Sequence, residues 1–179
     1  MDKQIKISKK ICMLGTFGVG KTSLVRRFVY DKFDEKYLST IGVQISQKQL
    51  PPMKNSSAGR TERLNLILWD LAQIEKFNNV IKNYFRGSQG AIIVFDVTRL
   101  KTFKETDVLL KSYLEMNPKS KLVFVGNKTD LVKSSELDLE QFLRLSESYQ
   151  TSYFLTSAKT GKNVGQLFTH IGKLLLEAD

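Results

Sequence analysis

The sequence predicts an α/β fold: a mostly parallel, doubly wound sheet of six strands, with helices on both faces and one antiparallel hairpin at an edge. Two observations lead to this fold class. Short apolar runs alternate with longer segments of helical periodicity, and one pair of runs is joined by a turn-rich loop instead of a helix. The 179 residues suit one domain, 1–179, because they contain neither a linker nor an internal repeat.

Five apolar runs predict strands that are buried on both faces, as in a parallel sheet covered by helices. They span residues 10–14, 64–69, 91–95, 121–125 and 152–155. The sixth predicted strand, 42–49, precedes the segment 51–63, which is rich in Pro, Ser, Gly and Asn. We expect this segment to be a long hairpin loop, since ordinary hairpin loops hold about two to five residues.

Four segments between the strands predict helices, because their apolar residues recur at helical spacing. These segments span residues 22–30, 102–116, 139–149 and 164–176. Asn117 and Pro118 end the second helix, and acidic Glu136 and Asp138 precede the third, where negative charge favours a helix start.

Composition limits the function classes. Lys and Arg number 28 against 18 Asp and Glu, for a formal charge of +10. The basic residues are spread along the chain without interleaved aromatic residues, which argues against nucleic-acid binding and leaves weak attraction to acidic surfaces. Cys12, the single cysteine, is predicted to be a buried strand thiol. No apolar run approaches membrane-spanning length, and the N-terminal residues lack the apolar core of a signal peptide. A single cysteine cannot form an intramolecular disulfide, so a reducing, cytoplasmic compartment is expected.

Residues 15–22, GTFGVGKT, match the phosphate-loop pattern G-x-x-x-x-G-K-[ST] and lie between a predicted strand and a predicted helix. The backbone N–H groups of such a loop surround phosphate oxygens, and the helix N-terminus adds partial positive charge. Lys21 is expected to reach the terminal phosphates, and the Thr22 hydroxyl to ligate Mg²⁺. The nucleotide-binding residues expected here are Gly15, Phe17, Gly18, Val19, Gly20, Lys21, Thr22 and Ser23.

Two tetrapeptides predict a binding site for a nucleotide base, and the first of them favours guanine over adenine. NKTD, 127–130, follows a predicted strand at the sheet edge where α/β proteins bind ligands. The Asp130 carboxylate can accept two N–H bonds, from guanine N1 and N2, and adenine lacks this donor pair. TSAK, 156–159, would hold the base from the other side. The base-binding residues expected are Asn127, Lys128, Asp130, Ser157, Ala158 and Lys159.

These motifs, together with STIGVQI (39–45), YFRGSQGAIIVFDVT (84–98) and VGNKTDL (125–131), resemble the Ras superfamily of small GTP-binding proteins over nearly the whole chain. The likeness is greatest to the Rab branch, which has a P-loop NTPase fold. It implies that Thr40 and Asp70 join Thr22 at Mg²⁺. It also implies that Phe33 lies edge-on against guanine and that Tyr37 closes over the phosphates.

The resemblance also implies partners. Ile45, Trp69 and Tyr84 match an apolar trio that contacts effector proteins, although core packing would explain Trp69 equally well. An exchange factor and a monomeric state are expected. Rab-like proteins usually end in prenylated cysteines, but no cysteine follows Cys12. We therefore expect no prenyl anchor on this sequence: either a C-terminal tail is missing from it, or the protein contacts membranes peripherally, through partners or its basic surface.

The chain departs from the family where water would attack GTP. The family pattern W-D-T-A-G-Q-E reads W-D-L-A-Q-I-E at 69–75, so Gln73 replaces the glycine and Ile74 replaces the water-orienting glutamine. Phe17 stands where the family has a small residue. Ile74 cannot hydrogen-bond water, so no catalytic residue is intact, unless Gln73 substitutes for the missing glutamine. We predict GTP and Mg²⁺ binding with slow hydrolysis.

Three functional interpretations remain. The leading one is a Rab-like switch with weakened hydrolysis, in membrane traffic or signalling. The second is a GTP-loaded scaffold that never hydrolyses its nucleotide and recruits partners, in part through the 51–63 loop. The third, a P-loop kinase or ATPase, is disfavoured by the 127–130 motif and by the lack of an Arg-rich lid segment. Asp96 is interpreted as a structural, hydrogen-bonding aspartate.

Overall fold

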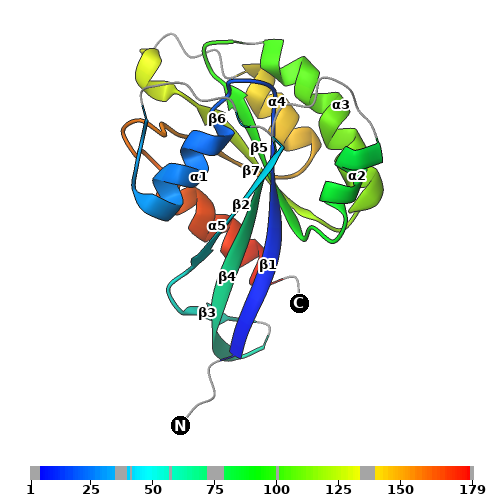
Figure 1. Ribbon diagram of the computed structural model, residues 1–179, viewed down its shortest axis with the longest axis vertical. Coiled ribbons are helices and arrows are strands. Elements are labelled where there is room, and N and C mark those ends of the chain that lie inside the picture. The colour runs from blue at the N-terminus through cyan, green and yellow to red at the C-terminus, as the bar shows by residue number, and fades with distance from the viewer. Residues whose placement is uncertain are drawn as a thin grey trace.

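A computed structural model describes residues 5–34, 40, 42–56, 58–71, 79–99, 101–133 and 140–177 (Figure 1). The strands are β1 (Ile5–Leu14), β2 (Val43–Gln49), β3 (Met53–Asn55), β4 (Arg60–Leu71), β5 (Gly90–Asp96), β6 (Lys121–Asn127) and β7 (Ser152–Leu155). The helices are α1 (Lys21–Tyr30), α2 (Asn79–Phe85), α3 (Lys101–Met116), α4 (Glu140–Ser148) and α5 (Val164–Leu176). A 3₁₀ turn, Thr129–Leu131, follows β6.

The sheet has the order β2-β4-β1-β5-β6-β7, with β3 paired to β4. Strands β1 and β4 to β7 run parallel, whereas β2 and β3 are antiparallel to β4. The predicted fold class is confirmed, with one difference in the strand count. Met53–Asn55 was expected to be loop but pairs with residues 60–62 of β4 as a short seventh strand.

Each face of the sheet carries its own apolar core, because successive strand residues point to opposite faces. In β1, Ile11 and Met13 pack with α1 and α5, while Cys12 and Leu14 pack with α2, α3 and α4. Cys12 is fully buried, as its place in an apolar run predicted.

The parallel strands deliver polar residues to one edge of the sheet. Gly15 follows β1, β5 ends at Asp96, β6 ends at Asn127, and Thr156 follows β7. All four lie at the carboxyl ends of parallel strands, the top of the sheet in Figure 1, where open α/β sheets form ligand sites.

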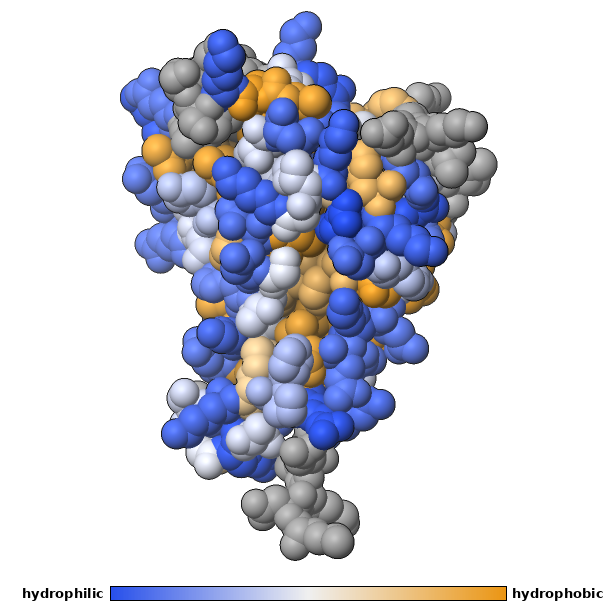
Figure 2. Space-filling view, turned by 90° about the vertical axis from the view of Figure 1, so that its left-hand side faces the viewer, coloured by the Kyte–Doolittle hydropathy of each residue, from blue (hydrophilic) through white to orange (hydrophobic). Residues whose placement is uncertain are grey.

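Figure 2 shows a face on which hydrophilic side chains predominate and apolar side chains are exposed in smaller areas between them. Among the described residues, no helix has the length and apolar character that crossing a membrane requires.

Candidate functional site

The phosphate loop between β1 and α1 requires glycine at both ends. Gly15 has a φ of +143°, and a Cβ there would lie 2.3 Å from the Val94 carbonyl oxygen. Gly20 has a φ of +99°, and its Cβ would lie 2.3 Å from the Asn127 Nδ2. A side chain at position 15 would collide with fixed backbone, and one at position 20 would have to displace the Asn127 amide; both positions also have a φ that disfavours residues other than glycine. The structure gives the backbone N–H groups of Gly18, Val19 and Gly20 no acceptor among the described residues.

Lys21 begins α1, but its side chain folds back under the phosphate loop. Its Nζ donates to the carbonyl oxygens of Gly15 (2.8 Å) and Thr16 (3.1 Å). Burial lowers the pKa of Lys21 to about 8, opposed by the negative charge of Asp70. A buried cation held by neutral carbonyls is stabilised by any anion that binds in the loop, and phosphate is such an anion.

Three oxygens from separate elements meet beside the loop. The Thr22 Oγ1 lies 2.6 Å from the Thr40 Oγ1 and donates to the Asp70 Oδ2 at 2.5 Å. Asp70 is 1% exposed, and its Oδ1 has no hydrogen-bond partner among the described residues. Burial raises the pKa of Asp70, and the bond from Thr22 and the charge of Lys21 oppose this.

This oxygen cluster fits Mg²⁺. Magnesium prefers oxygen ligands and usually keeps water or phosphate in its shell, so it needs only one or two carboxylates from the protein. The orphaned Oδ1 of Asp70 is the buried atom that such a cation would satisfy. The described residues hold no cluster of three His, Cys, Asp or Glu side chains, so no carboxylate-rich metal site competes with this one.

The loop after β6, which is predicted to bind the base, is held by hydrogen bonds to the phosphate loop and to the segment after β7. Asn127 donates from Nδ2 to the Val19 carbonyl (3.0 Å), and its Oδ1 accepts from the Ala158 N–H (3.2 Å) and the Thr156 hydroxyl (3.2 Å). The Ser157 hydroxyl donates to the Asp130 Oδ1 at 2.6 Å. Ser157 bonds to Oδ1 and leaves the second Asp130 oxygen to other partners, so a two-point contact between the carboxylate and a base edge requires Ser157 to release or share Oδ1.

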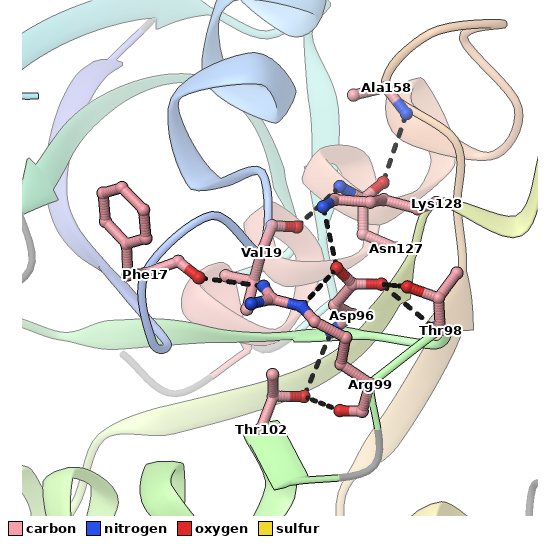
Figure 3. A network of polar contacts seen from close by, with 9 residues as sticks. All are labelled: Phe17, Val19, Asp96, Thr98, Arg99, Thr102, Asn127, Lys128 and Ala158. Carbon is pink, nitrogen blue, oxygen red and sulfur yellow. Dashed lines mark hydrogen bonds and ion pairs between the residues drawn. The ribbon is translucent and has the colours of Figure 1, made fainter. Parts of the chain in front are cut away.

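Asp96 and its partners lie next to both loops (Figure 3). Its Oδ2 accepts from Lys128 Nζ (2.7 Å) and from Arg99 Nε (2.9 Å), and its Oδ1 accepts from the Thr98 hydroxyl (2.6 Å). Burial alone would raise the pKa of Asp96, but the bonds from Lys128 and Thr98 hold it below its usual value. The interpretation of Asp96 as a hydrogen-bonding aspartate agrees with these contacts.

Two arginines in this region were missed by sequence reasoning. Arg27 of α1 donates to the carbonyl oxygens of Ala158 (2.9 Å) and Lys159 (2.7 Å), and thus supports the 156–159 loop. Arg99 donates from Nη2 to the Phe17 carbonyl oxygen at 2.8 Å. Neither residue belongs to a nucleotide-binding motif, so only their tertiary positions reveal them.

The structure brings most of the predicted site residues that it describes to one edge of the sheet. Phe17 and Phe33 need separate description, and three predicted residues lie outside the described part of the chain. Phe17 is 46% exposed, and its ring points away from Arg99 while its carbonyl faces it (Figure 3). Phe33 is half-buried and packs against the core on the α1 and α5 face. Tyr37, Gln73 and Ile74 lie outside the described residues.

The expected effector trio forms a contiguous surface. Ile45 of β2 is paired with Trp69 of β4 and is 55% exposed. The rings of Trp69 and Tyr84 are 6.3 Å apart between centroids. Lys10 lies over the Trp69 ring, 3.8 Å from its centroid. Trp69 therefore belongs partly to the core and partly to the surface, which leaves both interpretations of it in place.

Comparisons with known proteins agree with this geometry. A model of the Ras family matches residues 10–177. The chain is also 35% identical over 178 residues to the Ras-related protein Rab-21 of Geodia cydonium, an alignment that covers 99% of this chain and 75% of that protein. With the fold, the phosphate loop and the guanine motifs in place, the chain belongs to the Ras family, as a Rab-like small GTPase.

Proposed function

We propose that the protein binds GTP or GDP with Mg²⁺ and acts as a switch whose GTP form contacts effectors, while its own hydrolysis of GTP is slow. One observation supports nucleotide binding most directly. Buried Lys21, the Thr22–Thr40–Asp70 oxygen cluster and the loop that contains Asp130 all lie at the same edge of the sheet. Bound Mg²⁺ would neutralise negative charge on the phosphates.

Each part of the edge takes one part of the nucleotide. Lys21 and the N–H groups of residues 18–20 bind the phosphates, and Asp130 binds the guanine N–H groups. The Ala158 N–H, with Ser157 and Lys159, closes the other side of the base. Phe33 and Tyr37 complete the pocket on the switch side, as the family likeness implies.

Slow hydrolysis rests on three residues. Ile74 has no group that hydrogen-bonds a water molecule, and phosphoryl transfer depends on positioning and charge stabilisation. Gln73 replaces a glycine whose N–H faces the γ-phosphate in the family, and its side chain is the one candidate to replace the missing glutamine. The half-exposed Phe17 ring occupies space beside the phosphate loop that an activating protein would need.

The test compares the rate of GTP hydrolysis in the wild type and in the double variant Phe17→Gly/Ile74→Gln. Purified protein is loaded with GTP, and the bound nucleotide is followed by HPLC in a single turnover. We expect the double variant to hydrolyse GTP at least about tenfold faster, because a water-positioning group contributes that much or more.

Ile74→Leu is the matched control, since it changes shape at the same position without adding a hydrogen-bonding group. Its rate should equal that of the wild type. A wild type that turns over GTP as fast as the double variant would contradict slow hydrolysis. A gain in Ile74→Leu would show that side-chain shape, not water positioning, limits the rate.

The second candidate function is a permanently GTP-loaded scaffold, which is favoured by the retained Ile45–Trp69–Tyr84 surface beside altered hydrolysis residues. The two functions differ in whether the nucleotide cycles. A switch loses GTP over hours by exchange or slow hydrolysis, and its affinity for effectors falls with the GTP content. A scaffold keeps GTP through purification and incubation.

The cellular setting proposed for either function is a cytoplasmic monomer in membrane traffic or signalling, reset by an exchange factor. Contact with membranes would be peripheral, through partners or through the basic surface that follows from the net charge of +10. Flotation of the purified protein with anionic liposomes, compared with neutral liposomes, tests the membrane part separately.

A further inference from the structure

The buried carboxylate of Asp96 holds two cations that belong to different loops. Lys128 comes from the base-recognition motif and Arg99 from the turn between β5 and α3, and both donate to the same oxygen, Oδ2 (Figure 3). The Thr98 hydroxyl and N–H occupy Oδ1. The Asp96 side chain is 1% exposed, so the carboxylate is a fixed point to which both cations are attached.

Arg99 extends this network to the phosphate loop. Its Nε donates to Asp96, and its Nη2 donates to the Phe17 carbonyl, so the two contacts use different N–H groups of one planar guanidinium. The backbone fixes the arginine as well, because its N–H donates to the Asp96 carbonyl (2.9 Å) and its carbonyl accepts from the Thr102 hydroxyl (2.8 Å).

The bond to Phe17 determines where the next N–H points. A trans peptide is planar, so the Phe17 carbonyl and the Gly18 N–H point in opposite directions. The carbonyl faces Arg99, outside the loop, and the Gly18 N–H therefore faces the loop interior. That N–H has no acceptor among the described residues, and a cation on the carbonyl side polarises the amide and strengthens its donor.

We propose that Arg99 is a positioning residue that holds the Phe17–Gly18 peptide with its N–H toward the phosphates, and that Asp96 couples this hold to the base loop through Lys128. The inference rests on the proposed nucleotide binding. Its consequence is slow release of nucleotides that carry a β-phosphate. A glycine with a φ of +72° at position 18 gives the peptide freedom to rotate, and Arg99 removes that freedom.

The experiment measures the dissociation rate of fluorescent GDP from the full chain, with Arg99→Ala, Arg99→Lys and the wild type. We expect Arg99→Ala to release GDP about tenfold faster, the effect of one charge-assisted hydrogen bond that is partly exposed to water. Arg99→Lys should be intermediate, because a single ammonium lacks the fork that contacts Asp96 and Phe17 together.

A second measurement separates positioning from a general loss of structure. Competition with GMP, which lacks the β-phosphate, should give the same affinity in Arg99→Ala and the wild type within about twofold, because base contacts remain. Arg144→Ala is the control, since Arg144 forms an ion pair with Glu140 on the surface of α4, outside the site.

Two results would overturn the inference. One is a GDP release rate in Arg99→Ala within about twofold of the wild type. The other is an equal loss of affinity for GMP and GDP, which would mean that Arg99 supports the base pocket or the fold instead of the phosphate loop. A wild type without affinity for any guanine nucleotide would overturn the proposed function instead, so the two failures are distinguishable.

Discussion

The two ends of the candidate site differ in how their buried polar groups are satisfied. At the predicted base end, the Asn127 side chain bonds to the Val19 carbonyl, the Ala158 N–H and the Thr156 hydroxyl, and Ser157 donates to Asp130. At the phosphate and metal end, the Asp70 Oδ1 and the Thr16 Oγ1 are buried without a partner among the described residues. The buried side-chain groups of Asn127 and Ser157 are therefore satisfied within the chain, whereas Asp70 Oδ1 and Thr16 Oγ1 are not.

This difference implies different roles for the ligand at each end. A network that is satisfied by its own residues holds its shape before the ligand arrives, which favours selectivity for the base. A buried carboxylate oxygen without a partner costs free energy until a cation or donor reaches it, so ligand binding should stabilise that end most. We expect base choice to depend on fixed side chains and retention to depend on the metal.

The largest expected effect follows from changing the base end. Asp130→Asn replaces one carboxylate oxygen by an N–H₂ group, which faces a guanine donor instead of accepting from it. We expect the affinity for GDP to fall roughly a thousandfold, the size of effect seen when a polar site meets a group that it cannot pair. Competition against fluorescent GDP measures it.

Asp107→Asn is the matched control for that variant. Asp107 pairs with Lys111 on α3 at 2.7 Å, outside the site. Its substitution should leave GDP affinity unchanged. If Asp130→Asn keeps its affinity within about tenfold, the carboxylate does not select guanine and the base end needs another explanation.

The second effect concerns the metal end. Removal of Mg²⁺ by EDTA should speed GDP release from the wild type on the order of a hundredfold, because the cation neutralises phosphate charge. In Thr22→Val the hydroxyl is lost, so GDP should leave quickly with or without Mg²⁺. Thr22→Ser keeps the hydroxyl and should behave like the wild type. Equal sensitivity to EDTA in all three proteins would remove Thr22 from the metal site.

The sequence predicted the parts of the site that depend on the backbone of short segments. The phosphate loop and the 127–130 and 156–159 motifs are local patterns with fixed places after strands, and they lie together because parallel strands end at one edge. The 164–176 and 152–155 elements were predicted with their observed bounds, since each has a regular apolar pattern.

The features that the sequence did not predict depend on contacts between distant segments. Arg99 and Phe17 are 82 residues apart, and nothing local to either residue indicates their hydrogen bond. Met53–Asn55 forms β3 only because the start of β4 offers it a partner strand. β1 extends back to Ile5 for the same reason, beyond the apolar run at 10–14, since residues 5–9 pair with residues 62–66.

The smallest expected effect tests whether the base end of the site is structurally coupled to the phosphate loop. Gly20 is the point of contact, because a Cβ there would lie 2.3 Å from the Nδ2 of Asn127, a side chain that is 1% exposed and held by several hydrogen bonds. Gly20→Ala should lower the free energy of unfolding by about 2–3 kcal/mol, from backbone strain and from displacement of Asn127. This corresponds to a melting temperature lower by about 5–10 °C.

Gly59→Ala is the control variant. The φ of Gly59 is also positive, +65°, but nothing lies within 4 Å of the new Cβ, so only backbone strain remains, about 1 kcal/mol. The excess loss in Gly20→Ala then measures the coupling through Asn127. If both variants melt at the same temperature, the Asn127 amide moves aside freely, and the base end is independent of the phosphate loop.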